Sequence, residues 1–162
     1  MPYPPIAGLP PGKQITGIVD YDNVKVEWNR YELSNGITLC LTALPLAIFA
    51  TDMTDAKGMP AYIITWSNVL RVTAPEAHSG TPTPPIPPDQ LRRTPTTLVK
   101  PLTSNEPWSE FELRDGHTLR SRLIVTEIRR ITNAFDQMGM PSFLVNSQNV
   151  LDVSETSQGT RE

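Results

Sequence analysis

Cysteine is nearly absent from this sequence of 162 residues: Cys40 is the only one. A single thiol excludes an intramolecular disulfide framework, and we expect it to be packed inside the fold rather than to bridge two chains. The two histidines, His78 and His117, lie at no spacing typical of a metal site or a catalytic triad. Glycine-rich phosphate loops of the Walker or Rossmann type are also missing. The sequence therefore predicts no catalytic residue, no metal ligand and no cofactor, and we expect a protein that is not an enzyme.

No apolar run in the sequence is long enough to cross a bilayer. The longest, from Leu39 to Ala50, has twelve residues and is interrupted by Thr42 and Pro45, whereas a spanning helix needs about 20. An excess of positive charge is missing too, because 14 basic and 17 acidic residues give a net charge of -3. The chain thus has no global field that would attract nucleic acid or anionic lipid.

The N-terminal sequence MPYPPIAGLPPG lacks the basic start of a secretory signal or an organelle transit peptide. We therefore expect a protein of the cytoplasm or of a virion, without a membrane span, that is not exported through a recognisable signal peptide.

A repeated segment is the clearest positive feature of the sequence. When Trp28 is aligned with Trp108, WNRYELSNGITL matches WSEFELRDGHTL at a spacing of 80, and after one inserted residue the match continues at a spacing of 81. Fourteen positions are identical over about 45 aligned residues, where average composition would give about three. In the first copy these are Trp28, Glu32, Leu33, Gly36, Thr38, Leu39, Asp55, Gly58, Met59, Pro60, Asn68, Val69, Leu70 and Val72. The chain is predicted to contain one small module twice.

Each copy is predicted to form antiparallel β-structure. Asn35-Gly36 and Asp115-Gly116 stand at equivalent positions between alternating runs, and both dipeptides favour the type I′ turn of a β-hairpin. The run that follows is longer than a typical strand, so we expect it to bend or break near Pro45. Two shorter strands are then predicted in each copy. They cover residues 61–66, 69–73, 142–147 and 150–154.

These patterns predict an all-β protein with a module of four or five strands in tandem. Such modules usually close into a small barrel or a rolled sheet, because closure removes exposed strand edges. Each copy resembles SH3-like and Sm-like barrels in the number and length of its strands, without a diagnostic motif of either. A module of about 45 residues buries too little surface to be stable alone, so we expect the copies to pack on each other or on neighbouring subunits. Residues 14–20 and 24–28 are expected to extend the first module or to cross to the second.

Proline separates the modules from extended segments. Residues 74–107 hold nine of the seventeen prolines and are predicted to form an extended connector, mostly in the polyproline II conformation. Three roles fit it: a flexible spacer, a segment that wraps a surface, or a tether that lets each module dock on a different neighbour. The predicted organisation is an N-terminal arm (1–13), a first module (14–73), the connector (74–107), a second module (108–154) and a polar tail (155–162).

Acidic residues do not indicate a calcium site. Asp52 and Asp55 lie close together before Gly58, but the spacing of an EF-hand loop is absent. Asp55 and its counterpart Asp136 are instead predicted to stabilise the turn before each Gly-Met-Pro.

The two copies differ most in the run that follows the hairpin. In the first copy it is ITLCLTALPLAIFA. Such a strand would be buried on both faces, which one small module cannot achieve, so we predict that it binds a partner surface. That partner is the second module, another subunit or an unrelated protein. The predicted partner-binding residues are Leu41, Leu44, Leu46, Ile48 and Phe49.

The second copy has HTLRSRLIVTEIRRIT at this position, with arginine in place of apolar residues. Arg120 and Arg122 share a strand face by the period of two. This face is either a phosphate-binding patch or a solvated face whose arginines pair with nearby glutamates, which we favour. The candidate anion-binding residues are Arg114, Arg120, Arg122, Arg129 and Arg130, and the candidate glutamates are Glu110, Glu112 and Glu127.

Three functions fit these features. The first is a non-enzymatic structural protein whose modules and extended arms dock into a larger complex of protein subunits, such as a homo-oligomer or a virion lattice. The second is a single-stranded nucleic-acid-binding protein that uses the arginines of the second module, with an affinity that falls steeply with salt. The third is an adaptor whose TPTPPIPP segment is bound by a polyproline-recognising domain. We favour the first.

Overall fold

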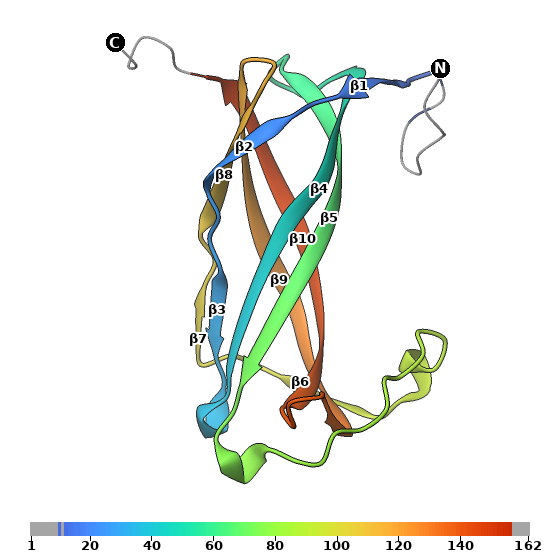
Figure 1. Ribbon diagram of the computed structural model, residues 1–162, viewed down its shortest axis with the longest axis vertical. Coiled ribbons are helices and arrows are strands. Elements are labelled where there is room, and N and C mark those ends of the chain that lie inside the picture. Colours follow the sequence, from blue (N-terminus) through green and yellow to red (C-terminus); the bar gives the residue numbers. More distant parts are fainter. Residues whose placement is uncertain (1–9, 11, 157–162) are drawn as a thin grey trace.

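The chain folds into β-strands joined by turns and loops (Figure 1). The computed structural model describes residue 10 and residues 12–156, and no α-helix occurs among them, which confirms the all-β prediction. In this part of the chain no helix has the length and apolar character needed to cross a membrane. The described strands are β1 (Ile15–Ile18), β2 (Tyr21–Lys25), β3 (Asn29–Glu32), β4 (Thr38–Thr54), β5 (Pro60–Thr73), β6 (Thr96–Val99), β7 (Thr103–Asn105), β8 (Trp108–Leu113), β9 (His117–Phe135) and β10 (Pro141–Glu155).

The strands form two antiparallel sheets of the same plan. Sheet A is centred on β4, which pairs along one edge with β5 and along the other with β3 near its start and β1 near its end. β7 adds to the far side of β3. Sheet B is centred on β9, with β10 along one edge, β8 and β6 sharing the other, and β2 on the far side of β8.

Two short strands are exchanged between the halves of the chain. β2 precedes the β3–β4 hairpin, yet it pairs with β8 in sheet B, where Tyr21 lies opposite Leu113. β7 precedes β8, yet it pairs with β3 in sheet A, where Ser104 lies opposite Tyr31. The segment before Trp28 thus does both things that the sequence left open: β1 extends sheet A and β2 crosses to sheet B.

The structural repeat is longer than the segment that the sequence identifies. Strands β1 to β5 and β6 to β10 occupy equivalent places, so the first repeat runs from Ile15 to Thr73 and the second repeat from Thr96 to Glu155. Part of the predicted connector, residues 74–107, therefore belongs to the second repeat, because Thr96–Val99 is β6 and Thr103–Asn105 is β7. These short strands depend on the edges of β9 and β3, a tertiary effect that local sequence does not reveal.

The strands after each hairpin are more continuous than predicted. β5 and β10 are single strands where two each were expected, because Asn68 and Asn149 continue the ladder instead of interrupting it. β4 bends beside Pro45, as predicted, but does not break: a register shift leaves Leu46 without a partner in the ladder. The equivalent shift in β9 falls at Thr126.

Both hairpins form at the predicted dipeptides. Asn35 and Gly36 have positive φ values of 67° and 77°, as a type I′ turn requires. In the second hairpin Gly116 is left-handed, with a φ of 92°, whereas Asp115 is not. The Gly116 N–H donates to the carbonyl of Leu113, so the loop is a turn followed by a left-handed glycine, and the type I′ prediction is wrong there.

Two aspartates stabilise the turns that precede the Gly-Met-Pro segments, as predicted. Oδ1 of Asp55 accepts hydrogen bonds from the backbone N–H groups two and four residues ahead, at 2.8 and 3.0 Å. Oδ1 of Asp136 accepts the equivalent bonds at the same distances. The turns that begin β5 and β10 are therefore built alike.

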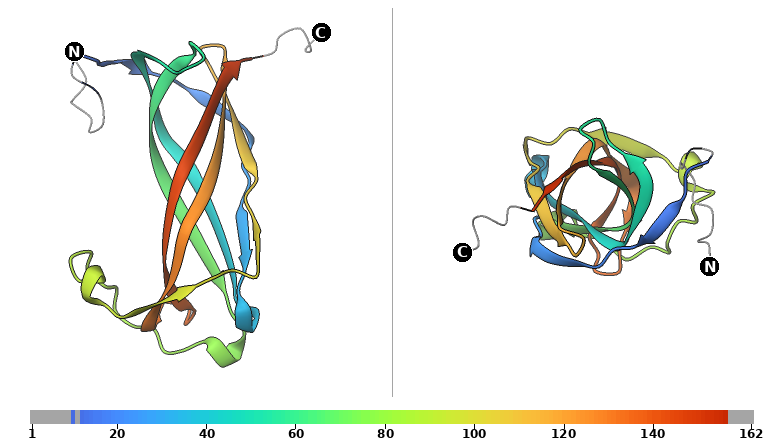
Figure 2. Two further views of the ribbon diagram at one scale, coloured as in Figure 1. Left: turned by 180° about the vertical axis from the view of Figure 1, so that it is seen from behind. Right: turned by 90° about the horizontal axis from the view of Figure 1, so that it is seen from above.

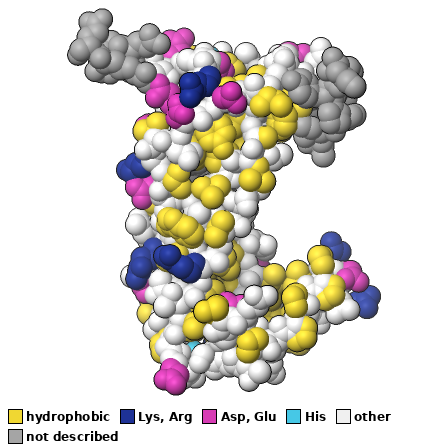
Figure 3. Space-filling model, in the orientation of Figure 1, with side chains coloured by type: hydrophobic (Ala, Val, Ile, Leu, Met, Phe, Trp, Pro, Cys, Tyr) yellow, Lys and Arg dark blue, Asp and Glu magenta, His cyan; other side chains and the backbone are white. Residues whose placement is uncertain are grey.

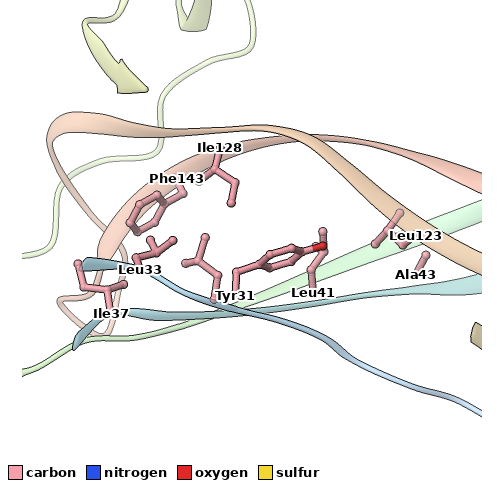
Figure 4. Packing of buried hydrophobic residues seen from close by; sticks show 9 residues of the cluster. Tyr31, Leu33, Ile37, Leu41, Ala43, Leu123, Ile128 and Phe143 are labelled. Atoms are coloured by element: carbon pink, nitrogen blue, oxygen red, sulfur yellow. The ribbon is translucent and has the colours of Figure 1, made fainter. Parts of the chain in front are cut away.

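The two sheets pack face to face and enclose apolar residues from both repeats (Figures 1 and 2). At the lower end in Figure 1, the β3–β4 hairpin packs on the ends of β9 and β10 that lie next to their connecting turn. Figure 4 shows Leu33 of this hairpin lying close to Ile128 and Phe143. We call this cluster core 1. It comprises Tyr31, Leu33, Ile37, Leu39, Leu41, Ala43, Leu123, Ile128 and Phe143.

The other cluster, core 2, reverses the roles of the repeats. Here the β8–β9 hairpin of the second repeat packs on the parts of β4 and β5 that lie next to their connecting turn. Its residues are Ile48, Tyr62, Phe111, Leu113, Leu119 and Val153. Tyr31 and Phe143 of core 1 correspond by position to Phe111 and Tyr62 of core 2. Neither repeat supplies all of either core, which confirms that the copies pack on each other.

The connector wraps the lower end of the molecule before it enters β6 (Figure 1). The Gly80 N–H donates to the carbonyl of Gly139 at 2.9 Å. Thr83 bonds with Phe135 through its backbone N–H and its hydroxyl, at 3.0 to 3.1 Å. The chain then loops outward and returns as β6 on β9. These contacts fit a segment that wraps a surface.

Candidate interaction surface

The outward side of sheet A carries a band of apolar side chains. Strand residues alternate between the two faces of a sheet, and Leu41, Ala43 and Ile48 point inward into the cores. The residues of β4 that alternate with these therefore point outward. In β5, Ile63 and Val69 point outward in the same way, because they alternate with the inward residues Tyr62, Ile64 and Leu70. We call this band the outer apolar face. It comprises Ile18, Leu44, Leu46, Phe49, Ile63 and Val69.

Several of these side chains are open to solvent. Leu46 is 69% exposed, Ile18 60% and Val69 37%. Phe49 links neighbouring strands, because it lies opposite both Ile18 of β1 and Ile63 of β5. Figure 3 shows apolar side chains gathered across this side of the molecule. Exposed apolar groups that adjoin one another mark interaction sites more often than isolated ones do.

The five residues predicted to bind a partner divide between this face and the interior. Leu44, Leu46 and Phe49 lie on the outer apolar face, whereas Leu41 and Ile48 are 4% and 0% exposed in cores 1 and 2. Leu41 differs from Leu44 by ordinary alternation, whereas Ile48 faces inward because the register shift at Leu46 reverses the alternation. Inward residues therefore have odd numbers before Leu46 and even numbers after it. Leu41 and Ile48 therefore share cores with residues of the second repeat, which is one of the three partners that the sequence left open.

Sheet B is less apolar at the equivalent place. Leu98 and Leu144 correspond to Ile18 and Ile63, but Arg129 lies between them where sheet A has Phe49. Thr126 occupies the bulge position of Leu46. Nε of Arg129 lies 2.8 Å from Oε1 of Glu127, an ion pair that the sequence predicted. The difference between the copies therefore centres on two positions, 46 and 49 in the first repeat.

The predicted arginine face does not form one patch of unengaged cations. Arg114 pairs with Asp22 at 3.1 Å, and Arg129 pairs with Glu127. Nε of Arg122 donates to the backbone carbonyl of Glu106 at 2.7 Å. These contacts occupy side chains that a phosphate would otherwise bind. The remaining candidates are Arg120, which stacks on a tryptophan, and Arg130, which is half-buried on β9.

Each repeat stacks an arginine on its equivalent tryptophan. Cζ of Arg120 lies 4.8 Å from the ring centroid of Trp108, and Cζ of Arg71 lies 5.2 Å from that of Trp28. The arginines come from different strands, since Arg120 is in β9 and Arg71 is in β5. A cation is thus held over the ring in both repeats by different sequence positions.

Buried tyrosines tie the repeats together through polar bonds. The Tyr31 hydroxyl donates to Oε2 of Glu106 at 2.7 Å and accepts a bond from Nδ2 of Asn29. The Tyr62 hydroxyl donates to a carboxylate oxygen of Asp115. Burial, followed by the bond to the carboxylate, raises the pKa of each tyrosine above its usual range. Both tyrosines therefore stay protonated in the folded protein.

The described residues do not assemble a recognisable catalytic or metal-binding group. Cys40 is buried, as expected, and no group of three or more potential ligands that could hold a metal occurs among them. His117 lies 3.1 Å from Oδ1 of Asp115 at the second hairpin. Two surface cavities of about 350 Å³ are lined by other residues and include neither Cys40 nor His117.

Comparisons with protein-family models, with curated proteins and with solved structures find no match to this chain. The outer apolar face is the arrangement that most directly indicates an interaction, because its most exposed member, Leu46, lies in a bulge between apolar neighbours on three strands.

Proposed function

We propose that this chain is a non-enzymatic structural protein that docks into a larger protein assembly through the outer apolar face. A virion or a similar lattice is one such assembly, and a homo-oligomer is the simplest. The proline-rich arm and connector would add further contacts, and each repeat would serve as the SH3-like or Sm-like building block that its strand count suggests. The cytoplasm or a virion would be its location.

The observation that carries this proposal is the exposure of Leu46 and Ile18 beside half-buried apolar neighbours on one side of sheet A. Burying one such side chain stabilises a complex by about 1.5–3 kcal/mol. The equivalent side of sheet B carries Thr126 and the Arg129–Glu127 ion pair. The two sides differ at these central positions, and this difference suits a subunit that docks in a defined orientation through sheet A.

The test is the mass of the purified full-length protein in solution, measured by light scattering over a range of concentrations at two salt levels. We expect association that persists in high salt, because apolar contacts are not screened. Leu46→Lys should raise the dissociation constant at least about tenfold. Thr126→Lys, the same change at the equivalent bulge of β9, is the matched control and should leave the constant unchanged.

A monomer at all concentrations would remove self-association from the proposal. Equal effects of the two lysine variants would show that the outer apolar face is not the docking site. Binding of single-stranded nucleic acid through Arg120 and Arg130 is the second candidate. Fluorescence anisotropy with a labelled oligonucleotide would support it if affinity fell steeply with salt and Arg130→Gln weakened binding.

A further inference from the structure

Each core of this protein needs one hairpin from the first repeat and one strand pair from the second, or the reverse. The exchanged strands follow the same rule, since β2 pairs with β8 and β7 pairs with β3. None of these contacts depends on the two repeats belonging to the same chain. We propose that the repeats also pair between chains, so that the first repeat of one copy accepts the second repeat of another and forms repeat-exchanged oligomers.

The polar contacts between repeats would make this pairing specific. Nζ of Lys57 lies 2.6 Å from Oδ1 of Asp152, and Nη2 of Arg114 lies 3.1 Å from Oδ1 of Asp22. In a pairing of two first repeats, Arg71 would take the place of Asp152 and would face Lys57. A like-charge contact would then replace an attraction, which disfavours that pairing.

The buried tyrosines impose the same preference. Tyr31 bonds to Glu106 of the second repeat, and the position in the first repeat that corresponds to Glu106 is Val26. A pairing of two first repeats would therefore leave the Tyr31 hydroxyl without this acceptor. In such a pairing, Tyr62 of one first repeat would take the place of Phe143 in the core that contains Tyr31 of the other. A first repeat is thus matched chemically to a second repeat.

The connector is long enough to allow the exchange. The 22 residues from Ala74 to Pro95 lie between the repeats, and in an extended polyproline conformation they would span up to about 68 Å. Gly80 and Thr83 attach them to the tip of the second repeat by a few hydrogen bonds. Release of these bonds would free the connector while the contacts within each assembled fold stayed the same. The connector would then set the concentration at which closed monomers give way to exchanged oligomers.

Two complementary variants test this. Leu39→Asp disrupts core 1 in the first repeat, and Leu119→Asp disrupts core 2 in the second; both leucines are at most 1% exposed. Each variant alone is expected to lose the fold. When both variants are refolded together from urea, the intact first repeat of the Leu119→Asp chain can pair with the intact second repeat of the Leu39→Asp chain. We expect about half of the wild-type circular dichroism transition to return, with the mass of a dimer.

The matched control is a mixture of Ile37→Asp and Leu39→Asp. Both residues lie in the first repeat, so exchange cannot produce an intact pair, and we expect no recovery. Recovery in the Leu39→Asp and Leu119→Asp mixture alone supports the proposal. Absence of recovery in both mixtures, or equal recovery in both, overturns it. All variants carry Leu46→Lys in addition, so association through the outer apolar face does not contribute to the result.

A second measurement applies if a single variant keeps its fold. Isotope-labelled and unlabelled chains with Leu46→Lys alone are refolded together at millimolar concentration, where exchange competes with the tethered monomer. Native mass spectrometry should show dimers of mixed mass that persist on dilution. If only monomers are found, the proposal is wrong, and the proposed docking through the outer apolar face is unaffected.

Discussion

The hydroxyl of Tyr31 in the first repeat donates a hydrogen bond of 2.7 Å to Oε2 of Glu106 in the second. The same carboxylate oxygen accepts the backbone N–H of Val125 at 2.8 Å, so one carboxylate joins β3, β9 and the segment before β8. Glu106→Ala would leave a buried hydroxyl and an N–H without their acceptor. We expect the free energy of unfolding to fall by about 2–3 kcal/mol, measured by urea denaturation.

Tyr31→Phe is the comparison variant. It keeps the bond between Glu106 and Val125, but it removes the bond to Glu106 and the acceptor of the Asn29 bond. We expect a loss of about 1 kcal/mol. A loss for Tyr31→Phe as large as that for Glu106→Ala would show that the bond to Val125 contributes no more than the Asn29 bond that Tyr31→Phe also removes. The double variant should lose less than the sum of the single losses, because both changes remove the same bond.

Stability should fall in alkaline solution because the pKa values of Tyr31 and Tyr62 are raised in the folded protein. Above pH of about 10 the unfolded chain releases these phenolic protons while the folded chain keeps them. The unfolded state then binds fewer protons, so the free energy of unfolding decreases as pH rises, by at most about 1.4 kcal/mol per pH unit for each tyrosine. Below that pH the two groups contribute no slope.

Urea denaturation from pH 8 to pH 11 measures this slope. A Tyr31→Phe, Tyr62→Phe double variant should show a clearly shallower decrease than the wild type. An unchanged slope in the double variant would mean that other groups, such as lysines, control the alkaline loss of stability.

Gly58 and Gly139 are equivalent turn residues with nearly equal φ values of 82° and 80°. A Cβ atom at Gly58 would meet nothing within 4 Å, whereas at Gly139 it would lie 2.7 Å from the carbonyl oxygen of Gly80. We expect Gly58→Ala to cost about 1–2 kcal/mol from backbone strain alone. Gly139→Ala should cost more, because it also displaces the connector.

The connector gives this comparison an independent measurement. Arg92 and Arg93 are exposed on it, so trypsin should cleave there faster in Gly139→Ala than in Gly58→Ala. Equal cleavage rates would show that the Gly80 contact does not hold the connector in place.

Arg120→Gln should remove the stack on Trp108 and lower stability by about 0.5–1 kcal/mol. Arg71→Gln should have a similar effect through Trp28. Each change should also alter tryptophan emission. Arg92→Gln, in an exposed turn of the connector, serves as the control and should change neither property.

Local signals predicted the local structure of this protein well. The left-handed residues at Asn35 and Gly36 and the aspartate bonds in the turns before Gly-Met-Pro follow from chemistry within a few residues of chain. The inserted residue that changes the spacing from 80 to 81 also has a local cause. Ala50 and Thr54 align with Arg130 and Phe135, so the extra residue falls between them, where Asn133 adopts a φ of 57°.

Tertiary features were beyond such signals. β6 and β7 have the sequences TTLV and TSN, and they are strands only because distant edges accept them. The inward direction of Ile48 depends on a register shift at Leu46 that the apolar pattern does not specify. One signal in the sequence does extend the repeat beyond the aligned modules. PYPPI at residues 2–6 and PTPPI at residues 82–86 share four of five residues at a spacing of 80. Residues 2–6 lie outside the described part of the chain.

The connector has one more consequence, which concerns how the two sides of the protein differ. In a dimer of identical chains, every substitution would occur on both sides at once, so an apolar patch suited to a partner would always be duplicated. Here the two halves belong to one chain, so the residues at the equivalent bulges, Leu46 and Thr126, can differ from each other. Joining the repeats lets a nearly symmetric fold carry different side chains at equivalent places in its two halves. A lattice built from it would have polarity that a symmetric dimer could not provide.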